Sequence, residues 1–145
     1  MPRQPMVLNG VSVTLCNKTI TTALTKAAQE TIINLTGLSS LALQAIFTYG
    51  SGGTSAKAYV QTSLDGGVTW VDIACFAFTT TTATKVSALT MRLAPATQAF
   101  APTNGTLTDD TVVNGVIGDR IRVILTTVGT YAGSTTLVVR GFAKS

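Results

Sequence analysis

Apolar and polar residues alternate along most of this chain, and that alternation predicts β-strands. The expected strands cover residues 11–16, 30–35, 41–49, 57–63, 68–78, 79–91, 119–127 and 134–143, with turn-forming Gly, Asp and Pro between them. Residues 19–28 are ambiguous, because their Ala, Leu and Lys content also suits a helical turn. About seven to nine short strands separated by turns predict an all-β protein, a single-domain β-sandwich that is jelly-roll-like.

Two hairpins are expected from the turn signals. The first joins residues 57–63 to residues 68–78, because Asp-Gly and Gly-Gly between them supply the positive φ angles of a tight turn. The strand that follows is apolar on both faces, so it is expected to lie within a sandwich or under another subunit. The second hairpin is expected to join residues 119–127 to residues 134–143.

Three arginines occupy alternating positions of this second hairpin. Arg120 and Arg122 alternate with apolar residues on its first strand, and Arg140 does so on its second. A turn centred near Tyr131 would place Arg122 opposite Arg140, which is unfavourable unless an acidic group lies over the pair. Arg120, Arg122 and Arg140 are therefore candidate partner-contact residues. A register shifted by one residue would instead place these arginines on opposite faces.

Two segments lack a strand period. Residues 1–10 contain two prolines and are expected to form an extended N-terminal arm, either disordered or wrapped around a neighbour. Residues 11–145 are expected to form one domain, without a linker or an internal repeat. Residues 94–114 predict a long loop, and loops of that length in compact domains often carry function. This segment is a candidate contact loop.

The composition suits strands that carry little charge. Hydrophobic residues make up 46% of the chain and charged residues 11%, against about 25% charged in a typical soluble domain. No apolar run is long enough for a membrane helix, so the apolar surface is expected in the core and in contacts with other subunits. A net charge of +4 with scattered basic residues argues against a nucleic-acid partner.

The residue types that catalysis needs are scarce. The chain has no histidine, which excludes Ser-His-Asp and Cys-His mechanisms and removes the commonest transition-metal ligand. Asp109 and Asp110, with Asn114, are a candidate calcium site, although calcium requires more oxygen ligands. Cys16 and Cys75 are expected to be buried thiols, with a disulfide or redox pair as the alternative. Neither enzymatic activity nor a cofactor is expected.

One motif is specific. Residues 63–70 match the Asp-box, Ser-x-Asp-x-Gly-x-Thr-Trp, at each specified position: Ser63, Asp65, Gly67, Thr69 and Trp70. The carboxylate can cap turn amides, glycine permits the bend, and the indole can anchor the hairpin. In sialidase-like propellers the box recurs once per blade, but here it occurs once and 145 residues are too few for such a propeller. It is interpreted as a structural turn, with a carbohydrate contact at Trp70 as the alternative.

The stretch around the box, residues 58–74, resembles small structural proteins encoded by tailed phages and prophages. Residues 116–127 and 135–140 are similar too, so the resemblance spans about half the chain. It implies a capsid decoration (cement) protein on the outer surface of a virion, made in the bacterial host cytoplasm. Its expected partners are the major capsid protein and itself, as a homotrimer. A phage tail or head–tail accessory protein is the alternative, and a carbohydrate-binding adhesin that uses Trp70 and exposed tyrosines is a third.

Overall fold

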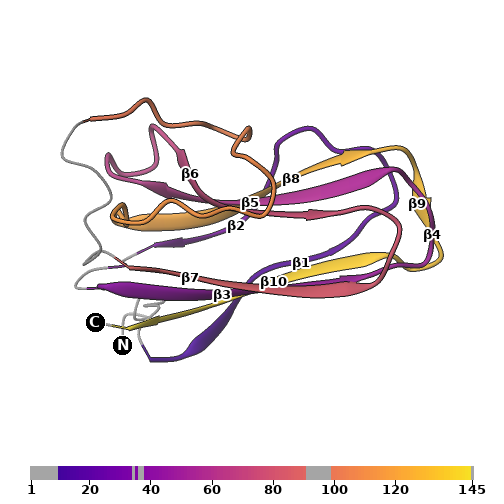
Figure 1. The fold of residues 1–145 in the computed structure, drawn as a ribbon, viewed down its shortest axis with the longest axis horizontal. Coiled ribbons are helices and arrows are strands. Elements are labelled where there is room, and N and C mark those ends of the chain that lie inside the picture. The colour runs from indigo at the N-terminus through magenta and orange to yellow at the C-terminus, as the bar shows by residue number, and fades with distance from the viewer. Residues whose placement is uncertain (1–9, 34, 36–37, 91–98, 145) are drawn as a thin grey trace, which may run out of the picture.

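A computed structural model describes residues 10–33, 35, 38–90 and 99–144, which form two packed antiparallel sheets (Figure 1). Sheet A has the strand order β1-β10-β3-β7, sheet B has the order β2-β8-β5-β6, and β4 pairs with β9 at one end. The strands are β1 (Ser12–Thr19), β2 (Ala27–Ile33), β3 (Ser40–Thr48), β4 (Ser51–Gly52), β5 (Ser55–Ser63), β6 (Val71–Phe78), β7 (Ala83–Thr90), β8 (Arg120–Val128), β9 (Tyr131–Ala132) and β10 (Thr136–Lys144).

The chain passes from one sheet to the other at nearly every connection. Among the long strands, only β5 and β6 follow each other in sequence and also pair within one sheet. Two four-stranded sheets connected in this order are a jelly roll, so the predicted all-β, jelly-roll-like sandwich is confirmed. The ambiguous residues near the start form the connection between β1 and β2, and the described residues contain no helix.

The second predicted hairpin is wrong. β8 lies in sheet B between β2 and β5, whereas β10 lies in sheet A between β1 and β3. Arg122 is therefore paired with Thr31 and Gln61, and Arg140 with Thr14 and Gln44. In β8 and β10, periodicity correctly indicated which side chains are buried. It cannot say whether the two strands pair in one sheet or face each other from two sheets, because both arrangements bury the same alternate positions.

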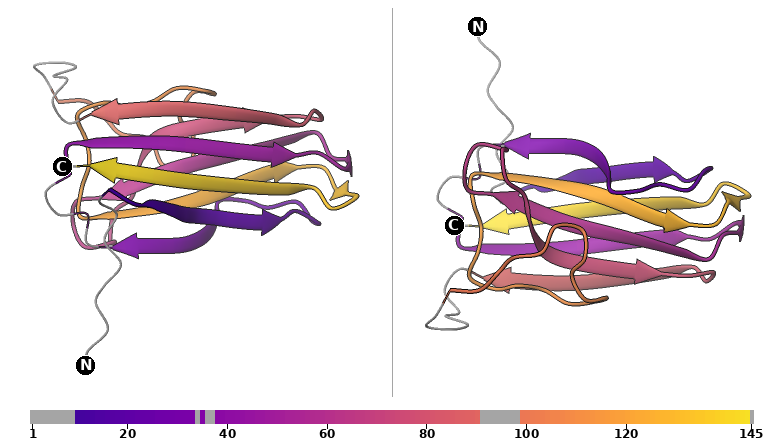
Figure 2. Two further views of the ribbon diagram at one scale, coloured as in Figure 1. Left: turned by 90° about the horizontal axis from the view of Figure 1, so that it is seen from below. Right: turned by 90° about the horizontal axis from the view of Figure 1, so that it is seen from above.

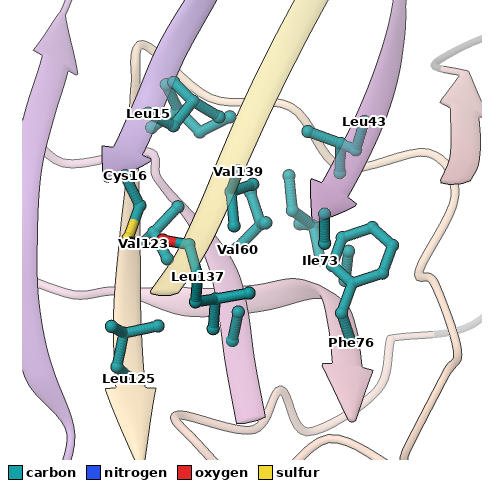
Figure 3. Packing of buried hydrophobic residues seen from close by; sticks show 14 of the residues in the cluster. Leu15, Cys16, Leu43, Val60, Ile73, Phe76, Val123, Leu125, Leu137 and Val139 are labelled. Atoms are coloured by element: carbon teal, nitrogen blue, oxygen red, sulfur yellow. Dashed lines mark hydrogen bonds between the residues drawn. The ribbon is translucent and has the colours of Figure 1, made fainter. Parts of the chain in front are cut away.

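The core fills the space between the two sheets (Figure 3). Val123 and Leu125 of β8 and Leu137 and Val139 of β10 are fully buried there. These side chains occupy every second position, as expected when one face of a sheet packs on another and its other face remains outside. The two outer faces are seen in Figure 2, sheet A on the left and sheet B on the right.

A β-bulge in β1 brings a cysteine into this core. The register of β1 against β10 shifts between Thr14 and Cys16, so Leu15 and Cys16 both face inward although they are consecutive. Burial raises the pKa of the Cys16 thiol to about 12 and that of Cys75 to about 11. Both cysteines are free and buried, which confirms the expected pair of thiols.

An aromatic cluster closes the end of the sandwich near β4 and β9. Tyr131 is 1% exposed and its ring meets those of Phe47 and Tyr49 edge-on, at centroid distances of 5.8 and 6.2 Å. Gly53, with a φ of 67°, faces this ring, and a Cβ there would lie 2.3 Å from it, so only glycine fits. The Tyr131 hydroxyl donates to the Thr79 carbonyl oxygen at 2.7 Å.

We expect Tyr131→Phe to lower the free energy of unfolding by about 1 kcal/mol, because the Thr79 carbonyl loses its donor at a partly buried site. Tyr49→Phe is the matched control, since the Tyr49 hydroxyl also donates to a backbone carbonyl, that of Gly52, but at an exposed site. Its loss should be a few tenths of that amount, because water can replace the hydroxyl. Urea unfolding measures both, and equal losses would contradict the assignment.

Candidate functional site

A long loop covers part of sheet B. Residues 99–119 cross its outer face and follow the edge of β6 (Figure 2, right). The Cys75 amide donates to the Thr111 carbonyl, and the Val113 amide donates to the Ile73 carbonyl, so the loop pairs with β6 in the manner of a short strand. The apolar outer side of this strand is thus covered by the chain itself. Residues 94–98 of the predicted contact loop lie outside the described residues.

The loop is fastened by the carboxylate of Asp72, which is 3% exposed. Its two oxygens accept hydrogen bonds of 2.7–3.1 Å from Thr103 Oγ1, from Gln61 Nε2 and from the amides of Gly105, Thr106 and Leu107. Burial raises the pKa of this carboxyl, but the hydrogen bonds outweigh it and hold the pKa below its usual range. This role of Asp72 was not predicted, because its signal in the sequence is only a lone aspartate within an apolar strand.

A row of polar side chains connects Asp72 to an arginine across three strands. Asp72, Gln61 and Arg122 are register partners on β6, β5 and β8. Gln61 is fully buried, donates from Nε2 to Asp72 Oδ1 at 2.8 Å, and accepts from Arg122 Nε at 2.8 Å. Because Asp72 fixes the Gln61 amide, Gln61 in turn fixes the orientation of the guanidinium.

The Asp-box residues form the turn between β5 and β6. Ser63 Oγ donates to Asp65 Oδ1 and accepts from the Gly67 amide, each at 2.8 Å. Asp65 Oδ1 also accepts from the Thr69 amide at 2.8 Å. Hydrogen bonds, first of all that from the Thr69 backbone, lower the pKa of Asp65 to about 2. The contacts are those that the interpretation as a structural turn requires.

The turn brings Trp70 onto Arg122 and brings Gly67 beside Arg120. The Arg122 guanidinium lies 4.3 Å from the centre of the Trp70 ring, a cation–π contact. Arg120 is two residues earlier on the same outer side of β8, and a Cβ on Gly67 would lie 2.9 Å from Arg120 Nη1 and 3.5 Å from Trp70 Cζ2. Arg120, Arg122 and Trp70 thus form one group, called here the arginine–tryptophan cluster.

The third predicted arginine lies elsewhere. Arg140 is on the outer face of sheet A, because its neighbours Val139 and Gly141 face the core side of β10. The cluster belongs to the outer face of sheet B, so the structure brings Arg120 and Arg122 together but separates both from Arg140. The pairing of Arg122 with Arg140 rested on the hairpin that the structure does not contain.

The acidic pair in the loop is held by lysines. Asp109 Oδ1 lies 2.8 Å from Lys57 Nζ, and Asp110 Oδ2 lies 2.8 Å from Lys85 Nζ. Asp110 Oδ1 also accepts from the Ala77 amide. Within the described ranges, no group of three or more His, Cys, Asp or Glu side chains is placed to hold a metal ion. The candidate calcium site is therefore two neighbouring ion pairs.

The tyrosines bear on the alternative of a carbohydrate-binding adhesin, which would use exposed rings. Tyr131 is buried in the core and Tyr59 is 5% exposed under Leu107, so the exposed tyrosines expected for an adhesin are not found at these positions. Tyr49 is half-buried in the aromatic cluster.

The part of the chain that the structure describes includes no helix long and apolar enough to cross a bilayer.

We expect Asp72→Asn to lower the free energy of unfolding by about 2–3 kcal/mol, because either orientation of the amide would turn its NH2 group toward buried donors. Residues 103–107 should then exchange their amide hydrogens faster. Asp109→Asn is the control, since it removes a carboxylate from an exposed ion pair and should cost about 0.5 kcal/mol or less. Urea unfolding and hydrogen exchange test both, and similar losses in the two variants would contradict the role of Asp72.

Stability should be nearly independent of pH around neutrality and should fall under acidic conditions. The folded pKa values of Asp65, Asp72 and Asp110 are lowered, so their stabilisation is complete above their unfolded pKa of about 3.9 and disappears as pH falls through the folded values. The chain has no histidine to titrate near neutrality. Thermal unfolding should give a nearly constant Tm from about pH 5 to 8 and a falling Tm below about pH 4. A Tm that rises on acidification would refute this.

No protein-family model, curated protein sequence or solved structure matches this chain. The features that point to a function are therefore those of its own described surface. The outer face of sheet B carries the Asp-box turn and the arginine–tryptophan cluster. The outer face of sheet A carries the other candidate binding surface.

Proposed function

We propose that this chain is a structural protein of a tailed-phage virion, a decoration protein that binds the capsid lattice and performs no chemistry. The observation that carries the proposal is the outer face of sheet A. The resemblance of residues 58–74 to phage structural proteins supports it, and so does the fold, because jelly rolls are common among capsid proteins.

The outer face of sheet A, the sheet nearest the viewer in Figure 2 (left), is apolar at one end and carries its charge on Arg140 and Lys144 of β10. Phe142, Ala42 and Ala88 are neighbours across three strands, and Gln44 and Val86 lie in the next row. Val86 is 72% exposed and Phe142 is 42% exposed. A shallow groove of about 460 Å³ runs over these residues and is also lined by Arg140. Contiguous exposed apolar side chains of this kind are typical of protein-binding surfaces.

The size of this face suits a repeated contact better than an isolated pair. Four strands about 4.8 Å apart and about 28 Å long present roughly 500 Å². A stable two-protein complex buries about 800 Å² on each partner, so one such contact would be weak. Many copies on a lattice, each also held by a second contact, gain strength through multivalency. We therefore assign the apolar end of this face, around Phe142, Ala88 and Val86, to an apolar surface of the lattice protein.

Two of the four sheet edges resist pairing with a further strand, which favours binding through a face. β6, an edge of sheet B, is paired with residues 111–113 of the loop. β7, an edge of sheet A, carries Lys85 on the side that faces the core, opposite Ala45. Inward-pointing charges and covered edges oppose the addition of another strand.

Deletion of the gene from the phage tests the proposed role. Heads should still assemble but should burst at a lower temperature, because the lattice loses its added contacts. Purified particles should carry on the order of hundreds of copies on the shell, in keeping with a repeating lattice. Heat-resistant heads without tails, or about six or twelve copies per particle, would instead indicate a tail or head–tail protein.

The face itself is tested by Val86→Asp, which places a charge at an exposed position without changing the core. Particle occupancy should fall, whereas Val128→Asp, a matched change at a 53% exposed valine at the end of β8, should leave it unchanged. If Val86→Asp instead dissociates an oligomer of the free protein, the face is a contact between copies of this chain, which would overturn the assignment to the lattice.

A further inference from the structure

We propose that the arginine–tryptophan cluster, Arg120, Arg122 and Trp70, binds carboxylate side chains of a partner protein. The inference rests on the proposed function, because it takes the ligand to be a protein. It adds the chemistry of recognition, and it places this second contact on the opposite outer face from the groove of sheet A. A protein with contacts on both outer faces can bridge two neighbours.

The cluster offers hydrogen-bond donors that the described residues leave unused. Arg122 donates through Nε to Gln61, and no carboxylate of the described chain forms an ion pair with either arginine. By contrast, Lys57 and Lys85 are each paired with an aspartate. Guanidinium and indole groups donate hydrogen bonds and accept none, so a ligand here must supply acceptors, and two positive charges favour an anion.

The cluster is also held in place before any ligand binds. Trp70 covers one side of the Arg122 guanidinium at 4.3 Å, and Gln61 holds its Nε at 2.8 Å. Arg120 lies beside Gly67, whose φ of 92° favours glycine. Side chains that are already ordered lose less entropy on binding. The planar fork of an arginine then fits the two oxygens of a carboxylate.

The surroundings favour a protein ligand over other anions. Leu64 is 68% exposed and Val68 is 82% exposed on the same turn. Exposed aliphatic side chains beside Trp and Arg are typical of protein interfaces. A nucleic acid requires a series of phosphate contacts along a basic stripe, and two arginines do not make one. Arg122 occupies one face of the Trp70 ring, which leaves less of it for stacking on a sugar.

The experiment uses the whole chain and the fluorescence of Trp70, its only tryptophan. Titration with hexaglutamate should give a saturable change that weakens as salt increases, and hexaglutamine should give none. The double variant Arg120→Gln/Arg122→Gln should weaken hexaglutamate binding by about tenfold or more, since it removes both charge-assisted contacts. Arg140→Gln/Lys144→Gln removes the same charge from sheet A, the opposite face, and should bind like the parent chain.

Several results would overturn the inference. The inference fails if hexaglutamate binds no better than hexaglutamine. It also fails if the two double variants weaken hexaglutamate binding equally, because equal weakening is a general charge effect. Tighter binding of an oligoglucuronate or an oligothymidylate than of hexaglutamate would show that the ligand class is wrong. If the arginine double variant unfolds, Arg120→Gln alone carries the test, because no hydrogen bond of the described fold depends on Arg120 Nη1. The hexaglutamate titration uses the free protein and needs no phage particle. A negative titration therefore overturns this inference, whereas particles that gene deletion and Val86→Asp leave unchanged overturn the proposed function.

Discussion

The buried carboxylate of Asp72 is the interaction on which the outer face of sheet B depends. A charge with 3% exposure is tolerated only where hydrogen bonds replace its lost water, and here five residues supply them. Four of these donors belong to residues 103–107, so the carboxylate determines where the loop lies. The fifth is Gln61, through which the same charge orients Arg122. Loop position and arginine orientation are thus two results of one desolvated group.

Much of the architecture could be predicted because it depends on the alternation of side chains. The two-sided apolar pattern of β6 correctly indicated cover on both faces, although the cover on its outer side is the chain's own loop. The pairing of strands was harder to predict. β8 and β10 lie in different sheets, yet they bury the same alternate positions that they would bury as the two strands of one hairpin. The inward position of Cys16 was also beyond a simple period, since the bulge adds a residue that interrupts it.

The surface site was partly predictable for a similar reason. The Asp-box specified its own turn, since the side-chain hydrogen bonds of Ser63 and Asp65 lie within residues 63–69. Arg120 and Arg122 were recognised by their outward positions, but their link to Trp70 depends on β5 lying between β8 and β6, which is a property of the tertiary fold. The role of Asp72 required knowing that residues 103–107 pass over it, and no local pattern in the sequence records that crossing.

The two buried thiols have a consequence for where the folded chain can exist. Thiol–disulfide exchange requires a thiolate that another sulfur can reach, and burial suppresses both the ionisation and the access of Cys16 and Cys75. Cys16 belongs to sheet A and Cys75 to sheet B. The two cysteines therefore present no accessible thiolate, so the folded chain can pass from reducing to oxidising surroundings without forming or exchanging a disulfide.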